Sequence, residues 1–234
     1  MQVLNSIADL REVARKRVPR AIFQYLDHGS YDEITLRRNR SDLEALRFRQ
    51  RVLIDVTRQS LQRDILGIPA TMPVVLAPCG LTGLVHRDGE ILAARAAQEF
   101  GVPLCLSTVS VCSIEDVRAA TTAPFWFQLY VMKDRGYTQA LMDRAAAAGC
   151  ETLVLTVDIP VSGLRRRDAK NGLAVPPRLT LANVLDIATK PAWAAGVLMG
   201  KRKTFGNLAG KSCLGDWYDS RWLGAAFGER ASSF

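Results

Sequence analysis

LTVDIPVSGLRRRDAKN, residues 155–171, begins as an apolar strand and becomes, within a few positions, a loop with three consecutive arginines. It overlaps ETLVLTVD (151–158), the last of four apolar runs of strand length. The other three are MPVVLAP near 72–78, VPLCLST near 102–108 and PFWFQLY near 124–130. None alternates cleanly between apolar and polar residues, which is typical of parallel strands covered on both faces.

Helical patterns separate these runs. Residues 88–100 and 134–148 are rich in alanine, and each stretch is followed by a glycine that can end a helix. Ser113 with Asp116 predicts a capped helix through residue 120. The repeated order strand, helix, strand predicts an α/β protein with parallel β/α architecture.

Three helices are expected before the first strand. Residues 6–17 place apolar side chains on one face, and Pro19 can open a second short helix that runs through Leu26. Ser30 followed by Glu33 predicts a capping box at the start of a third helix.

The four strands end in small and polar residues: APCG, LSTVS, FQLYV and TVDIPVSGLRRR. In a parallel β/α barrel the chemistry lies at these strand ends. An open dinucleotide-binding sheet would also use strand ends, but it needs G-x-G-x-x-G after its first strand, and the sequence has no such motif. The pattern therefore favours the barrel.

The bulk composition is that of a globular protein. The 234 residues carry 31 Lys and Arg against 23 Asp and Glu, a formal charge of +8, which favours nucleic acid, a phosphorylated cofactor, a small carboxylate or an acidic membrane as partner. Nucleic acid is the least favoured, since no module that combines aromatic and basic residues is recognisable.

The five cysteines form no C-x-x-C pair, so neither a disulfide framework nor a metal site is expected. No run of 18 apolar residues occurs that would cross a membrane. These features predict a cytoplasmic protein with reduced cysteines.

Seven segments over about residues 6–210 resemble, in the same order, the family of FMN-dependent 2-hydroxy acid dehydrogenases and oxidases. These segments are RVPRAIFQYLDHGSYDE, RFRQRVLIDVT, MPVVLAPCGLTGL, LSTVSVCSIEDV, FWFQLYVMKD, LVLTVDIPVSGLRRRDAKN and PPRLT. The resemblance implies a (β/α)8 barrel fold, of which the chain holds about the first four units. The expected parts are a helical and extended lead-in (1–70), the four units (71–175), a variable loop (176–210) and an atypical tail (211–234).

The resemblance also implies that FMN lies across the barrel mouth. Small residues after the first strand would let the backbone approach the flavin ring, while hydroxyl and amide groups after the next three would bond its polar edge. The residues carried over are Pro78, Cys79, Gly80, Ser107, Gln128 and Thr156. For Cys79 we expect a small, packed, inert thiol and not a nucleophile, because no histidine partner is evident.

On the substrate side, Arg165 matches the family arginine that grips the substrate carboxylate, a task suited to a planar guanidinium. Tyr25 matches a tyrosine that touches the same carboxylate, and Tyr130 one near the substrate hydroxyl. Asp158 resembles the aspartate that stabilises the catalytic histidine as imidazolium. As isolated residues, the tyrosines could equally be core residues and Asp158 a turn cap.

Several family features are missing. The catalytic histidine of S-N-H-G-x-R-Q, a second substrate arginine and the lysine of the fifth strand have no counterpart, and the only histidines are His28 and His86. A complete barrel has eight strands and about 250 residues. We therefore expect an N-terminal portion with an aberrant ending after residue ~210, and no useful turnover by this chain alone.

The resemblance is strongest to L-lactate dehydrogenases, with a quinone or cytochrome as electron acceptor and a homo-oligomeric full-length protein. Residues 176–205 combine an amphipathic pattern with Trp193 and the basic residues 201–203, which predicts peripheral contact with the cytoplasmic face of an acidic inner membrane. A solvated surface helix is the alternative. The competing function is a noncatalytic remnant that binds anions or membranes.

Overall fold

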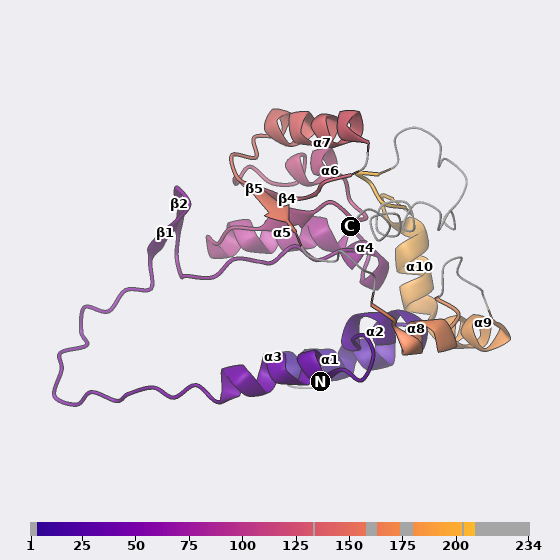
Figure 1. Cartoon of the computed structure of the whole chain (residues 1–234), viewed down its shortest axis with the longest axis horizontal. Helices are drawn as coiled ribbons and strands as arrows, with labels where there is room; N and C mark the ends of the chain where they lie inside the picture. Colours follow the sequence, from indigo (N-terminus) through magenta and orange to yellow (C-terminus); the bar gives the residue numbers. More distant parts are fainter. Residues whose placement is uncertain (1–3, 133, 158–162, 174–179, 203, 209–234) are drawn as a thin grey trace, which may run out of the picture.

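The computed structural model describes residues 4–132, 134–157, 163–173, 180–202 and 204–208. Figure 1 shows two layers: a small parallel sheet with its helices, and the N-terminal helices grouped with two later ones, α8 and α9. The helix α10 runs between the layers. The helices are α1 (Ile7–Arg17), α2 (Arg20–Asp27), α3 (Ile34–Glu44), α4 (Thr82–Val85), α5 (Gly89–Phe100), α6 (Ile114–Arg118), α7 (Arg135–Ala147), α8 (Arg166–Lys170), α9 (Leu181–Ala188) and α10 (Pro191–Met199).

The sheet contains three parallel strands in the order β3 (Cys105–Ser107), β4 (Trp126–Tyr130) and β5 (Leu153–Thr156). The α/β class is therefore confirmed. In the described part of the chain the sheet is open and no closed barrel forms.

The expected first strand at 72–78 is wrong in extent, because only a single parallel bridge, Leu76 to Leu104, forms there. Leu76 donates its N–H to Pro103 and accepts from Cys105, both at 2.9 Å. The prolines at both ends of the run remove backbone donors, so the ladder cannot extend. An antiparallel hairpin of β1 (Arg63–Ile65) and β2 (Ile68–Ala70) precedes this segment.

The helices that have a capping residue or a terminating glycine in the sequence were predicted correctly. The expected helices at 88–100 and 134–148 are α5 and α7, and the capping box of Ser113 and Asp116 starts α6. The capping box at Ser30 is wrong: α3 begins at Ile34, and Glu33 has a left-handed backbone (φ 57°). The Glu33 carboxylate instead accepts from the Gly29 N–H at 3.3 Å.

The core lies between the sheet and the helices α5, α6 and α7. Phe127 and Leu141 are fully buried in it. β3 and β4 are covered on both faces as expected, but β5 is not, since Leu153 and Leu155 are 44% and 55% exposed.

A buried carboxylate joins α5 to the neighbouring loops. Glu90 is 4% exposed and accepts backbone N–H groups from Gly83 (3.1 Å), Val111 (2.9 Å) and Cys112 (3.4 Å). Two of these donors lie in the loop after β3. Glu90 therefore fixes that strand end against the start of α5.

We expect Glu90→Gln to lower the free energy of unfolding by about 1–3 kcal/mol, because an amide NH₂ replaces an acceptor that faces backbone donors. Urea denaturation monitored by circular dichroism measures the change. The control is Glu99→Gln on the same helix, where the carboxylate is exposed. Equal midpoints for the two variants would contradict the role of Glu90.

Candidate active site at the strand ends

A row of hydroxyl, amide and hydroxyl groups crosses the carboxyl ends of the three strands. The Ser107 hydroxyl donates to Gln128 Oε1 at 3.1 Å, and Gln128 Nε2 donates to Thr156 Oγ1 at 2.6 Å. Parallel register puts the strand ends together, with Ser107 opposite Gln128 and Tyr130 opposite Thr156. Three of the six expected cofactor residues therefore form one hydrogen-bonded group, which we call the polar row.

Thr108 supports the polar row and was missed from the sequence. Its hydroxyl donates to the Gln128 carbonyl oxygen at 2.5 Å and accepts the Tyr130 N–H at 3.2 Å. Its own N–H reaches Gln128 Oε1 at 3.3 Å. In the sequence, Thr108 is visible only as a second hydroxyl residue in LSTVS. Its hydroxyl bonds backbone groups, and such partners cannot be identified from a sequence.

The expected backbone approach lies beside the row. Pro78 and Cys79 are exposed, and a Cβ added to Gly80 would lie 2.6 Å from Val109 Cγ2. The loop at 78–80 therefore packs closely against the loop that follows β3, and only glycine fits there. Cys79 is an exposed free thiol, so the expectation that it packs inside is wrong.

Arg165 and Tyr25 form a second group. The guanidinium lies over the Tyr25 ring, 4.6 Å from its centre, and donates to the carbonyl oxygens of Tyr25 and His28, the latter at 3.0 Å. It also pairs with the carboxylate of Asp168, whose side chain is 9% exposed. Burial raises the pKa of the Tyr25 hydroxyl above its ordinary value, although the charge of Arg165 opposes this shift.

The other two arginines of the triplet bind the start of α3. Arg166 pairs with Asp32 at 2.9 Å, and Arg167 lies 4.0 Å from Glu33. Both arginine side chains are more than half exposed. Such exposed pairs stabilise little.

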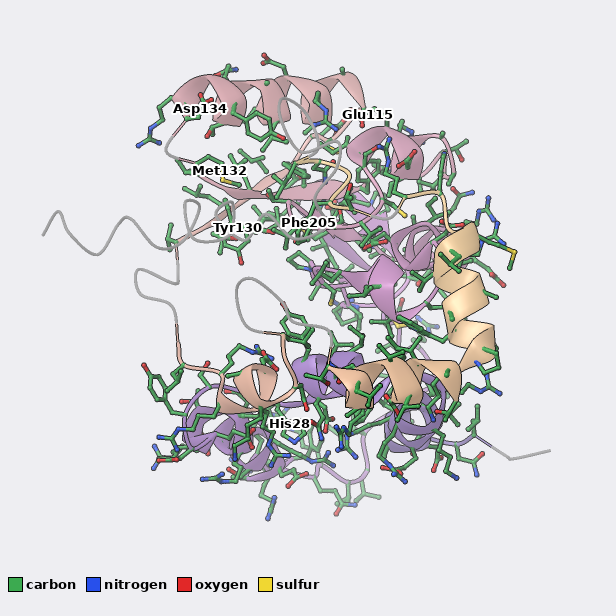
Figure 2. The ribbon with its side chains drawn as sticks, turned by 90° about the vertical axis from the view of Figure 1, so that its right-hand side faces the viewer. His28, Glu115, Tyr130, Met132, Asp134 and Phe205 are labelled. Atoms are coloured by element: carbon green, nitrogen blue, oxygen red, sulfur yellow. The ribbon has the colours of Figure 1, made fainter. Side chains whose placement is uncertain are left out.

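The polar row lies in the sheet layer, whereas Arg165 and Tyr25 lie among the N-terminal helices. Figure 2 shows Tyr130, at the end of β4, on the side of the sheet toward the helices that carry His28. His28 caps α2, which also carries Tyr25. Asp158 lies outside the described residues, so its predicted role stays a prediction.

Asn207 was also missed, and it joins a late segment to β3. It is 1% exposed, donates to the Ser107 carbonyl oxygen (3.2 Å) and the Ser110 hydroxyl (2.9 Å), and accepts the Ile114 N–H (2.8 Å). A Cβ on the neighbouring Gly206 would lie 2.5 Å from a backbone nitrogen. Residues 204–208 therefore pack tightly beneath the end of β3.

The polar row fits the polar edge of a flavin. The side-chain oxygen Oε1 of Gln128 accepts hydrogen bonds from the Ser107 hydroxyl and the Thr108 N–H. The second hydrogen on Gln128 Nε2 and the hydroxyl hydrogen of Thr156 have no acceptor among the described residues. Neutral donors of this kind can bond ring nitrogen and oxygen atoms without adding charge. Pro78 and Cys79, in the loop beside the row, are exposed.

The chain matches a family of known flavoenzymes. The family described as FMN-dependent dehydrogenase matches residues 14–229. The chain belongs to this family, whose cofactor is FMN.

Relatives that match nearly the whole of this chain are themselves longer than it. An L-lactate dehydrogenase of Caulobacter sp. strain K31 is 48% identical, and that of Caulobacter vibrioides strain NA1000 is 49% identical. Each match covers 96% of this chain, but the chain spans only 60% and 59% of the two relatives. Among solved structures, the monotopic membrane protein (S)-mandelate dehydrogenase superposes with a TM-score of 0.88 at 33% identity, covering 97% of this chain and 60% of that one.

We expect Gln128→Met to lower the free energy of unfolding by about 1–3 kcal/mol, since Ser107, Thr108 and Thr156 would all lose a buried partner. Chemical denaturation measures the loss. Gln139→Met is the control, because that amide is exposed on α7 and donates to Asp143 on the same helix. A loss no larger than in the control would show that the polar row does not hold the strand ends together.

Proposed function

We propose that this chain forms the cofactor-binding and substrate-binding portion of an FMN-dependent enzyme that oxidises an L-2-hydroxy acid, most closely L-lactate, to the 2-oxo acid. In this proposal the chain is the N-terminal portion of a (β/α)8 barrel, with a quinone or cytochrome as the final electron acceptor. The observation that carries it is the polar row of Ser107, Gln128 and Thr156 across three parallel strand ends.

The described residues have separate tasks in this proposal. FMN, when bound, supplies the acceptor for a hydride. The polar row and the backbone at 78–80 hold the ring, and Arg165 binds the substrate carboxylate. Tyr25 and Tyr130 contact the carboxylate and the hydroxyl of the acid.

Arg165 is already held in place for this task. Its contacts with Tyr25, His28 and Asp168 use Nε and Nη2, and no acceptor for Nη1 is found among the described residues. A fixed guanidinium loses little entropy when it binds a carboxylate. The ring of Tyr25 beneath it restricts its direction.

The proton of the substrate hydroxyl has no matching acceptor in this sequence. His28 Nδ1 lies 3.3 Å from the Gln24 carbonyl oxygen and His86 Nδ1 lies 3.0 Å from that of Arg87, and neither histidine matches the family base. We therefore propose that the chain binds FMN and the acid but does not turn over by itself. A noncatalytic remnant that binds anions is the alternative.

Flavin titration tests this proposal. We expect the purified chain to quench FMN fluorescence, and Thr156→Val to weaken binding by about tenfold, as the loss of one buried hydrogen bond predicts. Thr57→Val, in the exposed lead-in, is the control. The FMN-loaded chain should not be bleached by L-lactate under anaerobic conditions.

The possible outcomes separate the alternatives. A chain that does not bind FMN supports the noncatalytic remnant. Bleaching by L-lactate would mean that a base is present within these 234 residues. Weaker FMN binding in Thr57→Val than in Thr156→Val would place the ring elsewhere.

Peripheral membrane contact through α9 and α10 is part of the proposal. These helices expose Leu181, Leu185, Leu198 and Met199, each at least 60% accessible. The solved (S)-mandelate dehydrogenase is described as a monotopic membrane protein. No helix in the described part of this chain is long and apolar enough to cross a membrane.

The charges near these helices only partly favour contact with lipid. Lys201 and Arg202 both pair with Asp116, so one of their two positive charges is offset within the protein. Lys190 donates to the Lys16 carbonyl oxygen at 2.6 Å. Trp193 donates to the Leu84 carbonyl oxygen at 2.9 Å, which directs its indole N–H toward α4. Apolar insertion should therefore contribute more than charge.

We expect Leu198→Glu to reduce binding to vesicles that contain anionic lipid by about tenfold, because a carboxylate would enter the interface in place of an apolar side chain. Co-sedimentation measures the bound fraction. Leu43→Glu on α3 is the control, with 70% exposure against 66% for Leu198. If both variants sediment like the original chain, α10 is not the contact.

A further inference from the structure

A pocket of about 440 Å³ lies between α5, α6 and the segment that follows α10. Its lining comes from the turn before α5 (86–88), from α5 itself, from α6 and the two residues after it, and from Lys201. Cavities of this size commonly hold small molecules. The lining contains neither Arg165, Tyr25 nor any member of the polar row, so the pocket is separate from the candidate active site.

Both carboxylates in the lining are already bound by the protein. Asp116 pairs with Lys201 Nζ at 3.1 Å and also with Arg202. Asp88 accepts the backbone N–H of Lys201 at 2.8 Å and Arg87 Nε at 3.3 Å. These two carboxylates face three cationic side chains, so one positive charge is left without a counter-charge.

Arg95 adds a second positive charge to the pocket. It is an exposed residue of α5 that contributes to the lining, and its guanidinium has no partner among the described residues. The planar fork of N–H groups on a guanidinium matches the oxygen atoms of a phosphate. A phosphate monoester carries a charge of about −1.5 to −2 at pH 7. The excess of positive charge therefore fits a phosphate monoester better than an anion with a single charge.

The rest of the lining is apolar and consists of Ile91, Leu92, Ala119 and Ala120. Ile91 is 7% exposed, whereas Leu92 is 44% exposed and presents its side chain to an occupant. Inorganic phosphate would leave this apolar surface in water, while an ester with an apolar body would cover it. The lining therefore combines a place for an anionic group with a place for an apolar one.

We propose that this pocket, with Arg87, Arg95 and Lys201 in its lining, binds a phosphate monoester that carries an apolar body. The same chemistry is offered by a soluble ester and by a phospholipid with a monoester headgroup. The lipid source is relevant because α10 adjoins the pocket: a Cβ added to Gly196 would lie 3.8 Å from Arg87 Cβ, and Met199 is 60% exposed. The proposal does not rest on the proposed flavin site, because no residue of that site takes part.

Calorimetry with phenyl phosphate tests the proposal. The full chain is titrated at about pH 7.5, above the second pKa of a phosphate monoester, which is about 6. Benzoate is the matched ligand, because it has the same ring and a single negative charge. We expect phenyl phosphate to bind at one site, and benzoate to bind about tenfold more weakly, as the loss of one charge-assisted contact predicts.

Matched variants locate the site. Arg95→Gln should weaken phenyl phosphate binding by about tenfold. Arg135→Gln, which removes the same charge from an exposed position on α7, should not. Ala119→Trp keeps every cation but fills the pocket with an indole, so it should weaken binding at least as much as Arg95→Gln. Circular dichroism checks that the variants remain folded, and Arg87→Gln replaces any pocket variant that does not.

Vesicles distinguish the two sources of the ester. The chain is sedimented with phosphatidylcholine vesicles that contain either phosphatidic acid, a monoester, or phosphatidylglycerol, a diester. If the lipid is the source, Arg95→Gln should bind phosphatidic acid vesicles about tenfold more weakly than Arg135→Gln, and phenyl phosphate should compete. If a soluble ester is the source, the two variants sediment equally with both vesicles and still differ in phenyl phosphate binding.

Three results would overturn the proposal. One is that phenyl phosphate does not bind, or binds no more tightly than benzoate. Another is equal affinity for phenyl phosphate in Arg95→Gln and Arg135→Gln. The third is an unchanged affinity in Ala119→Trp, which would place the ester outside the pocket.

FMN is itself a phosphate monoester, so flavin binding is measured separately on the same variants. We expect Arg95→Gln to leave FMN affinity unchanged, and Thr156→Val to leave phenyl phosphate affinity unchanged. Weaker FMN binding in Arg95→Gln but not in Thr156→Val would contradict the flavin site at the polar row and leave the phosphate pocket standing. The two proposals therefore fail independently.

Discussion

The hydrogen bonds of one buried amide hold the site together. Gln128 is 3% exposed in the middle strand of an apolar sheet, where an unsatisfied amide would be costly. Its side chain bonds Ser107 on one neighbouring strand and Thr156 on the other. The Thr108 hydroxyl donates to its backbone carbonyl oxygen. Because these bonds form only in one parallel register, the amide fixes the relative position of all three strand ends. The hydroxyl and amide groups of the polar row are thereby fixed relative to one another by the protein itself.

The arginines after β5 illustrate how charge is accommodated at the edge of the core. Arg165 lies against the last turn of α2, where the carbonyl oxygens of Tyr25 and His28 have no intrahelical partner. A cation at a helix C-terminus satisfies these acceptors and the helix dipole together. Asp168 balances the remaining charge. Arg165 therefore joins α8 to α2 through Nε and Nη2, and Nη1 has no acceptor among the described residues.

The sequence predicted those features whose cause is local. The capping box of Ser113 and Asp116 and the glycines after α5 and α7 act within a few residues, and the structure contains all of them. The failed capping box at Ser30 shows the limit, because the left-handed backbone at Tyr31 and Glu33 redirects the chain before α3 begins. The polar row was predictable from the resemblance. Thr108 and Asn207 were not, because they bond backbone groups that folding brings near from distant parts of the chain.

The sheet is least secure where the proposed flavin site is least enclosed. Gln128 is 3% exposed and has a strand on each side, whereas Thr156 is only partly buried on a strand with one neighbour in the described sheet. Opening of a strand pair starts at the edge, where the fewest apolar contacts must be broken. Thr156 is therefore the member of the row that moves most readily, and affinity for the ring must depend on how firmly β5 is held. A strand added beside β5 would strengthen the site without touching the ligand, since it would lower the cost of keeping Thr156 in place.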